Sequence, residues 1–171
     1  MRGVLDIPDN LRPISEALAA ALTRVEDRFD HALASELPAV AALCKHVESY
    51  RGKMLRPTLA LLCGMAVARH SHAKNQGASD LPDPLITVAA VVEMVHMATL
   101  VHDDVLDEAD TRRRGRTVSS LHGNESAVIL GDYLIAAAYH LCAGLDDPHH
   151  ARRIGRISMD VCSGELLQLS N

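Results

Sequence analysis

Apolar residues recur at three- and four-residue intervals along most of this chain, the spacing typical of amphipathic helices. Six segments carry this pattern: residues 14–35, 38–50, 58–70, 85–108, 125–143 and 151–169. Pro13, Pro38 and Pro57 stand at or just before three of these starts, where the fixed φ of proline suits the first helical turn. The segments 71–84 and 111–123 are rich in Gly, Ser, Thr, Pro and charged residues and are predicted to be connections.

Composition supports an all-α fold. Ala, Leu and Met are abundant, aromatic residues make up only 2% and there is no Trp, whereas sheets depend on aromatic and β-branched residues. The 171 residues, 48% of them hydrophobic, are enough for one domain with an apolar core. We therefore expect residues 1–171 to form a single helical unit. The last helical pattern has no glycine or proline to end it, so we expect that helix to pack on something further.

Charge and sequence signals exclude several functions. A formal net charge of −5 argues against a nucleic-acid binder, which needs a basic face. The four cysteines are widely spaced without a CxxC pair, which predicts free thiols in a reducing cytoplasm. No signal-peptide pattern opens the chain. The longest apolar run, residues 85–101, is interrupted by Thr87, Glu93, His96 and Thr99, so no transmembrane segment is expected.

The stretch VHDDVLDEADTRRRGRT, residues 101–117, places five acids at the end of an apolar helix and three arginines directly after them. Asp103 and Asp107 are four residues apart and share a helical face, while Asp104 points about 100° away. Two such carboxylates suit Mg²⁺, which fills its other sites with water and substrate phosphate. Arg112 and Arg113 can bind phosphate in a bidentate manner. The alternative is a solvated helix end with internal Asp–Arg pairs.

A second basic element, RGKMLRP, lies upstream at the predicted start of a helix. Gly52, Lys53 and Arg56 there offer an anion site, although the stretch alone is also typical of a solvated loop. His96 lies on the same side of its helix as Asp103 and could add a hydrogen bond. A lone histidine on an apolar helix is more often a core residue. Together the two basic elements predict two separate diphosphate sites.

In this order and spacing, GKMLRP, EMVHMATLVHDDVLDEADTRRRGRTV, HGNESAVILGDYL and SGELLQL resemble the trans-isoprenyl diphosphate synthases, above all the long-chain polyprenyl type. The resemblance runs from about Arg51 to Leu169, and DDxxD followed by RR is its most specific part. It implies a bundle of long helices around an apolar cavity, usually a homodimer. It also implies Mg²⁺-dependent head-to-tail 1'-4 condensation of an allylic diphosphate with isopentenyl diphosphate.

The resemblance assigns roles residue by residue. Asp103 and Asp107 match the ligands that hold Mg²⁺ against the allylic diphosphate, with Asp104 in support. Arg112 matches the arginine that contacts the allylic diphosphate, and these four residues are the expected catalytic group. The residues matching isopentenyl diphosphate contacts are Lys53, Arg56, His96 and Arg113, and Gly52 beside them is also expected to bind substrate. In short-chain members an aromatic residue near Ala98 and Thr99 closes the cavity floor, so the small Ala98 implies a product longer than fifteen carbons.

The chain also departs from the family pattern. Family members are roughly twice as long, and their second half carries a KT pair and a second aspartate-rich motif. Asp132 and the pair 146–147 lack the surroundings to replace that motif, while Glu165 and Gln168 match a helix that precedes it. Two hypotheses remain: the N-terminal half of a synthase, with little or no condensation activity of its own, or a non-catalytic or split subunit that pairs with a second chain. A structural helical protein with an incidental acid cluster would need several coincidences.

Overall fold

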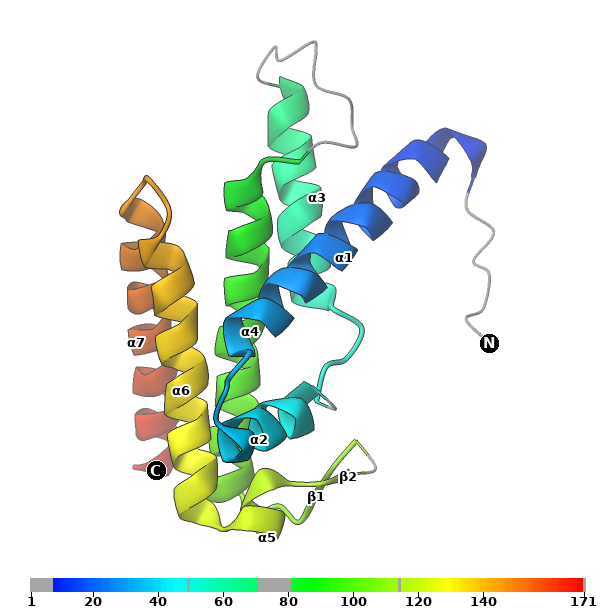
Figure 1. The fold of residues 1–171 in the computed structure, drawn as a ribbon. Coiled ribbons are helices and arrows are strands. Elements are labelled where there is room, and N and C mark those ends of the chain that lie inside the picture. Colours follow the sequence, from blue (N-terminus) through cyan, green and yellow to red (C-terminus); the bar gives the residue numbers. More distant parts are fainter. Residues whose placement is uncertain (1–7, 49, 71–80, 114, 171) are drawn as a thin grey trace.

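The computed structural model describes residues 8–48, 50–70, 81–113 and 115–170, and within them the chain is a bundle of helices with one small ribbon (Figure 1). The elements in chain order are η1 (Asp9–Leu11), α1 (Arg12–Leu33), α2 (Pro38–Glu48), α3 (Leu55–His70), α4 (Asp83–Leu106), β1 (Thr111–Arg112), β2 (Gly115–Arg116), α5 (Val118–His122), α6 (Asn124–Ala143) and α7 (His149–Leu169). The all-α prediction is confirmed, and all six predicted helices are present with bounds shifted by a few residues.

The connection predicted over 111–123 is wrong in part, because it contains regular structure. β1 and β2 form an antiparallel ribbon in which Thr111 pairs with Arg116 and Arg112 with Gly115. The five-residue helix α5 follows at once. Strands of two residues are too short to show an alternating pattern, so the sequence carries no periodic signal for them. Most of the other predicted connection, residues 71–80, lies outside the described residues.

Helix α4 is the centre of the bundle. It packs most extensively on α6 and also contacts α1, α3, α5 and α7. Eleven of its residues are buried, from Ile86 near its start to Asp104 near its end. A helix that is apolar on nearly all sides is one that its neighbours surround. The other helices are therefore positioned mainly by their packing against α4.

Helix α1 crosses α4 through one apolar stripe. Its buried residues are Ala17, Ala21, Val25, Phe29 and Leu33, a four-residue repeat that keeps them on one side. Phe29 and Leu33, near the end of α1, belong to the main core, which also contains residues of α2, α4 and α6. Ala21 and Val25 belong to a second core, with residues of α3 and the start of α4. Both cores contain residues of α4, which therefore contributes to each of them.

The close approach of α4 and α6 depends on a glycine. A Cβ atom added at Gly131 on α6 would lie 2.1 Å from Nε2 of His102 on α4. The bare backbone lets the His102 ring lie against α6, where Nε2 is 3.1 Å from the carbonyl oxygen of Val128. The contact lies one residue before Asp103. The packing of the two main helices is thereby linked to the acidic end of α4.

Most of the exposed large apolar side chains lie on three helices, α3, α6 and α7. On α7 only Ile154 is buried. On these three helices they are Leu55, Leu59, Leu62 and Val67 on α3, Val128 and Ile129 on α6, and Ile157, Met159, Val161, Leu166, Leu167 and Leu169 on α7. An apolar surface of this extent is typical of faces that pack against further protein.

Two of the described helices, α4 and α6, are long and apolar enough by length and composition to cross a membrane. Core helices of soluble proteins pass the same test, so this is weak evidence. The burial of α4 among five neighbouring helices accounts for its hydropathy. The absence of a transmembrane segment stays a prediction.

Leu134, which is fully buried on α6, tests this packing. Leu134→Ala should lower the free energy of unfolding by about 2–5 kcal/mol, because it removes transfer energy and leaves a cavity in the α4–α6 core. The measurement is urea unfolding followed by circular dichroism. Ile129→Ala on the same helix is the control, since Ile129 is 68% exposed and should change the value by roughly 0.5 kcal/mol at most. Equal losses in both variants would contradict the described core.

Candidate functional site

The acidic residues after the apolar segment lie where α4 ends. The helix stops at Leu106, and Asp107 takes the C-cap position with φ −86° and ψ 0°. The Asp107 N–H donates to the carbonyl oxygen of Asp103 at 2.8 Å, so the helical turn continues through Asp107. Side chains four positions apart on such a turn lie on the same side. Asp103 and Asp107 therefore form a pair of neighbouring carboxylates.

Asp103 is half-buried among other acids. Burial is the main cause that raises its pKa, and the carboxylates of Glu165 and Asp107 raise it further, while Arg112 acts in the opposite direction. Because Glu165 belongs to α7, an acid from a distant part of the sequence faces the end of α4. A divalent cation with oxygen ligands relieves such crowding of negative charge.

The described residues do not form a complete metal site by themselves. Among them, no group of three or more His, Cys, Asp or Glu side chains could hold a metal ion. Mg²⁺ usually takes one or two carboxylates and completes its octahedron with water and phosphate oxygens. The pair Asp103 and Asp107 fits that requirement, provided that a phosphate ligand is present.

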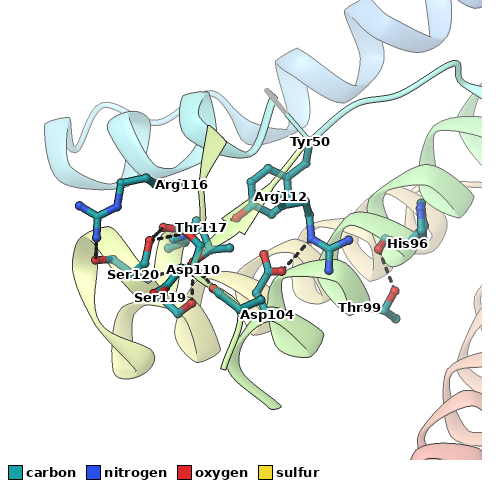
Figure 2. Close-up of polar contacts among 12 residues, drawn as sticks. Tyr50, His96, Thr99, Asp104, Asp110, Arg112, Arg116, Thr117, Ser119 and Ser120 are labelled. Atoms are coloured by element: carbon teal, nitrogen blue, oxygen red, sulfur yellow. Dashed lines mark hydrogen bonds and ion pairs between the residues drawn. The ribbon is translucent and has the colours of Figure 1, made fainter. Parts of the chain in front are cut away.

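Asp104 has a different environment from its two acidic neighbours. Its side chain is 1% exposed, and Oδ1 accepts a hydrogen bond from Nε of Arg112 at 2.7 Å (Figure 2). Asp104 is one position from Asp103, so its side chain points into the bundle, whereas that of Asp103 lies on the half-exposed side of α4. Its Oδ2 atom is buried and has no hydrogen-bond partner. Asp104 thus anchors Arg112, which is the Asp–Arg pairing that the solvated-end alternative proposed, although here it is buried.

Tyr50 supports this buried pair from the loop before α3. Its hydroxyl accepts a hydrogen bond from the Val118 N–H at 3.0 Å and faces Asp104 (Figure 2). Burial raises the pKa of Tyr50 to about 12, and the nearby Asp104 carboxylate adds to the shift, against the effects of Val118 and Arg112. The phenol therefore stays protonated. It connects three elements that are far apart in sequence: the loop after α2, the end of α4 and the start of α5.

The ribbon that carries the arginines is fixed at its base. The fully buried Thr117 donates its hydroxyl hydrogen to the carbonyl oxygen of Ala109 at 2.7 Å, and its N–H donates to Asp110 at 3.0 Å. As the N-cap of α5, it also accepts the Ser120 N–H at 3.1 Å. His46 on α2 adds a 2.9 Å contact from Nε2 to the carbonyl oxygen of Arg116.

Gly52 permits contact between the two basic elements. A Cβ at Gly52 would lie 2.3 Å from a terminal guanidinium nitrogen of Arg113, so Arg113 packs directly on this backbone. Lys53 and Arg56, one and four residues further on, are exposed. The structure therefore brings the two stretches predicted to bind phosphate side by side, with Arg113 as the link.

Backbone strain concentrates at the same place. Within the described ranges, three residues other than glycine have positive φ: Met54 (51°), Glu108 (50°) and Arg113 (47°). Met54 lies between Lys53 and Arg56, and Glu108 directly follows Asp107. Left-handed conformations of such residues cost energy and cluster at ligand-binding and active sites. Their positions agree with a site assembled from the loop before α3, the end of α4 and the ribbon.

His96 lies close to the cations from both basic elements. Its pKa is lowered to about 4, mainly by burial and then by Arg56, Arg113 and Arg112. At neutral pH the ring is uncharged and can donate one hydrogen bond. This environment differs from that of a core histidine, because three guanidinium groups act on it. The structure thus places His96 within range of the charges of Arg56, Arg112 and Arg113, and their roles in binding diphosphate stay a prediction.

Ala98 and Thr99 differ in their surroundings. Ala98 is fully buried in the main core, whereas Thr99 is half-exposed and its hydroxyl donates to the carbonyl oxygen of His96 at 2.8 Å (Figure 2). Thr99 is four residues before Asp103 and lies on its side of the helix; Ala98 is turned about 100° away. The packing therefore does not support Ala98 as a residue that lines the cavity of the product. Thr99 is the better candidate of the two.

Sequence reasoning missed three residues of this region. Tyr50 and Thr117 hold the frame, and Glu93 is a buried carboxylate one turn before His96. Thr117 had a weak signal, since threonine is a common N-cap residue. Tyr50 had none, because its partners are distant in sequence. Glu93 was noted on the helix but had no assigned role.

The fold defines the chain as an all-α helical bundle, and comparison with known proteins gives the family. The model of the polyprenyl synthetase family matches residues 38–171, which is more than half of the chain. The chain belongs to this family, and its helices are those of the isoprenoid-synthase bundle.

Two curated relatives and one solved structure illustrate the similarity. The all-trans-nonaprenyl-diphosphate synthase of Rhodobacter capsulatus is 33% identical over 94% of this chain and 45% of its own length. Heptaprenyl diphosphate synthase component 2 of Geobacillus stearothermophilus is 32% identical over 94% of this chain and 47% of its own. A polyprenyl synthase of Caulobacter crescentus CB15, solved with calcium and isoprenyl diphosphate, has a TM-score of 0.75 at 29% identity and is matched over 90% of this chain and 45% of its own. The chain spans less than half the length of these relatives.

The lowered pKa of His96 predicts a pH dependence of stability. Between pH 6.5 and about 4, the unfolded chain binds a proton at His96 that the folded chain does not, so the free energy of unfolding falls as the pH falls. His96→Gln should remove this part of the loss. Chemical unfolding at several pH values from 7 to 4.5 measures it.

Variants have to be compared because Glu93 and Asp103 have a raised pKa, which makes the free energy of unfolding rise as the pH falls. This change is opposite to the one caused by His96. His31→Gln, at an exposed histidine on α1, is the matched control. If His96→Gln and His31→Gln keep the same pH slope as the unaltered chain, the buried, cation-flanked environment of His96 is wrong.

Proposed function

We propose that this chain is the part of a polyprenyl diphosphate synthase that binds both diphosphate substrates and the first Mg²⁺ ions. The observation that supports this most is that a group of negative charges and a group of positive charges lie next to each other along α4. Asp103 and Asp107 gather negative charge at its end, while Arg56, Arg112 and Arg113 gather around His96 one to two turns earlier. A metal-bound diphosphate and a second, metal-free diphosphate need these two environments next to each other.

The allylic diphosphate is assigned to the acidic end of α4. Asp103 and Asp107 would hold Mg²⁺, which supplies Lewis-acid stabilisation of the departing diphosphate when bound. Arg112 is suited to contact the same phosphates because Asp104 fixes its Nε and thereby orients the guanidinium. Asp104 acts as a positioning residue in this scheme. The solved Caulobacter relative, which carries calcium and an isoprenyl diphosphate, supports a divalent cation in the family.

Isopentenyl diphosphate is assigned to the neighbouring basic cluster. Arg113, Arg56 and Lys53 offer charge to its phosphates, and Gly52 lets Arg113 reach across the loop. The neutral His96 can donate a hydrogen bond. The strained backbone at Met54 and Arg113 supports this assignment, since it holds the two basic elements in one arrangement before any ligand binds.

The reaction assigned to the whole synthase is 1'-4 condensation. The allylic C–O bond breaks, the isopentenyl double bond attacks the resulting cation, and a proton is lost. The residues of this chain contribute by binding the departing diphosphate and by fixing the second substrate next to it, which is electrostatic and orientational catalysis. No nucleophilic serine or cysteine takes part in this scheme.

A product longer than fifteen carbons fits the open side of α4. The half-exposed residues Val88, Val92, Val95 and Thr99 recur at three- and four-residue steps and lead along the helix to Asp103. None of these side chains is aromatic, so none would obstruct an extended apolar chain that starts at the acidic end. Thr99, rather than Ala98, is the position where a larger side chain would limit its length.

The second candidate function is that of a subunit that completes its site with another chain. The exposed apolar side chains on α3, α6 and α7 favour it, and one relative is by its name a component of a heptaprenyl diphosphate synthase. Pairing with a second copy of the chain would cover the same kind of surface. Both candidates assign the same roles to Asp103 and the basic cluster.

Ligand binding to the 171-residue chain tests the proposal. In isothermal titration calorimetry, farnesyl diphosphate should bind in the presence of Mg²⁺ and lose affinity when EDTA is added. Asp103→Ala should weaken the Mg²⁺-dependent binding by about tenfold or more, the loss of one strong charged contact. Isopentenyl diphosphate should bind with or without Mg²⁺.

Asp146→Ala is the control, since Asp146 is an exposed acid between α6 and α7. It should leave both affinities unchanged. Unaltered Mg²⁺-dependent binding in Asp103→Ala would remove the metal assignment. A failure of the unaltered chain to bind either diphosphate would remove the proposed function itself.

A further inference from the structure

Glu93 is a buried acid without an assigned role. Its side chain is 3% exposed, and its Oε2 atom has no hydrogen-bond partner. It lies on α4 one turn before His96, on the face that also buries Asp104 eleven residues later. An unpaired carboxylate in such a place is costly, so a structural role would be served better by an apolar residue.

The charges near Glu93 belong to the basic cluster. Arg56, Arg113 and Arg51 all act on it from outside its own helix, and His96 is its titratable neighbour on α4. Arg51 pairs with Asp30 through a terminal nitrogen and lies over the Phe29 ring at 4.1 Å, while its Nε atom is buried without a hydrogen-bond partner. For Arg56 and Arg113, no carboxylate of the described residues lies within 4.0 Å. Glu93 also lies beyond that distance, and it is a buried acid on which both cations act at longer range.

A diphosphate on Arg56 and Arg113 would compete with Glu93 for the same positive charge. Burial raises the pKa of Glu93 even though three arginines lower it. A bound diphosphate offsets those arginines, so the carboxylate would be stabilised less and would take up a proton more readily. Ligand and carboxylate charge thus oppose each other across the cluster.

We propose that Glu93 is an internal counter-ion that competes with isopentenyl diphosphate for Arg56 and Arg113, so that its charge weakens binding and a proton enters the site as the ligand binds. The inference rests on the proposed function and adds a reason for a costly buried acid. After each condensation the elongated diphosphate has to leave the isopentenyl site before the next unit can enter. A built-in competing anion favours that departure.

Glu93→Gln tests the inference, because it removes the charge and keeps the shape. At pH 7.5, calorimetry with isopentenyl diphosphate should give an affinity about tenfold higher for Glu93→Gln than for the unaltered chain. Titrations in two buffers of different ionisation enthalpy should also give fewer protons taken up per ligand bound. The phosphates of the ligand are the same in both experiments, so the difference in protons belongs to Glu93 and to the effect of its charge on the neighbouring His96.

Glu26→Gln, at an exposed acid on α1, is the matched control and should leave affinity and proton uptake unchanged. Thermal unfolding should show Glu93→Gln to be at least as stable as the unaltered chain, because it removes a buried charge. Equal or weaker binding with unchanged proton uptake would overturn the counter-ion role and leave the proposed function intact. If Glu93→Gln fails to fold, proton uptake by the unaltered chain decides: an uptake no larger than that of the free ligand's own phosphates overturns the inference. No binding to the unaltered chain overturns the proposed function, and this inference with it.

Discussion

The buried ion pair between Asp104 and Arg112 determines the geometry of the whole site. It joins the last turn of α4 to the first strand of the ribbon at 2.7 Å, with the Asp104 side chain 1% exposed and the Arg112 side chain 24% exposed. Removing one member of such a pair leaves an uncompensated charge, which typically costs about 3–5 kcal/mol. Arg113 follows Arg112 directly, so its approach to Gly52 depends on the same anchor. Tyr50 and Thr117 hold the two flanks of this arrangement, and the acids, the arginines and the loop before α3 therefore keep fixed relative positions.

Most of the fold could be predicted because it depends on local spacing. α1 buries every fourth residue from Ala17 to Leu33, and a stripe of that kind is visible in sequence. The ribbon could not be predicted. Its strands have two residues each, and its turn uses Arg113 at positive φ where a glycine or asparagine would have given a signal. Tertiary contacts to α2 and α4 stabilise it, and those are not encoded in any short window.

The site was predictable where helical phase alone decides. The four-residue step places Asp103 and Asp107 together, and the resemblance to a known family pointed to His96 and the arginines. The roles of Asp104 and Ala98 could not be read in this way. Each is one position from a residue on the open side, and a single step turns a side chain about 100° into the core. The partner of Asp104 lies eight residues further on, after a chain reversal that has no periodic signal.

The contact between Gly131 and His102 has a consequence beyond helix packing. The contact limits how closely the last turns of α4 can approach α6, at the residue before Asp103. A methyl group at position 131 would displace the imidazole or push the two helices apart, and the carboxylates at the end of α4 would move with it. The position of Asp103 relative to its neighbours thus depends on the absence of a side chain at Gly131 on α6. Position 131 can in this way affect the placement of Asp103 and Asp107, although it lies on another helix.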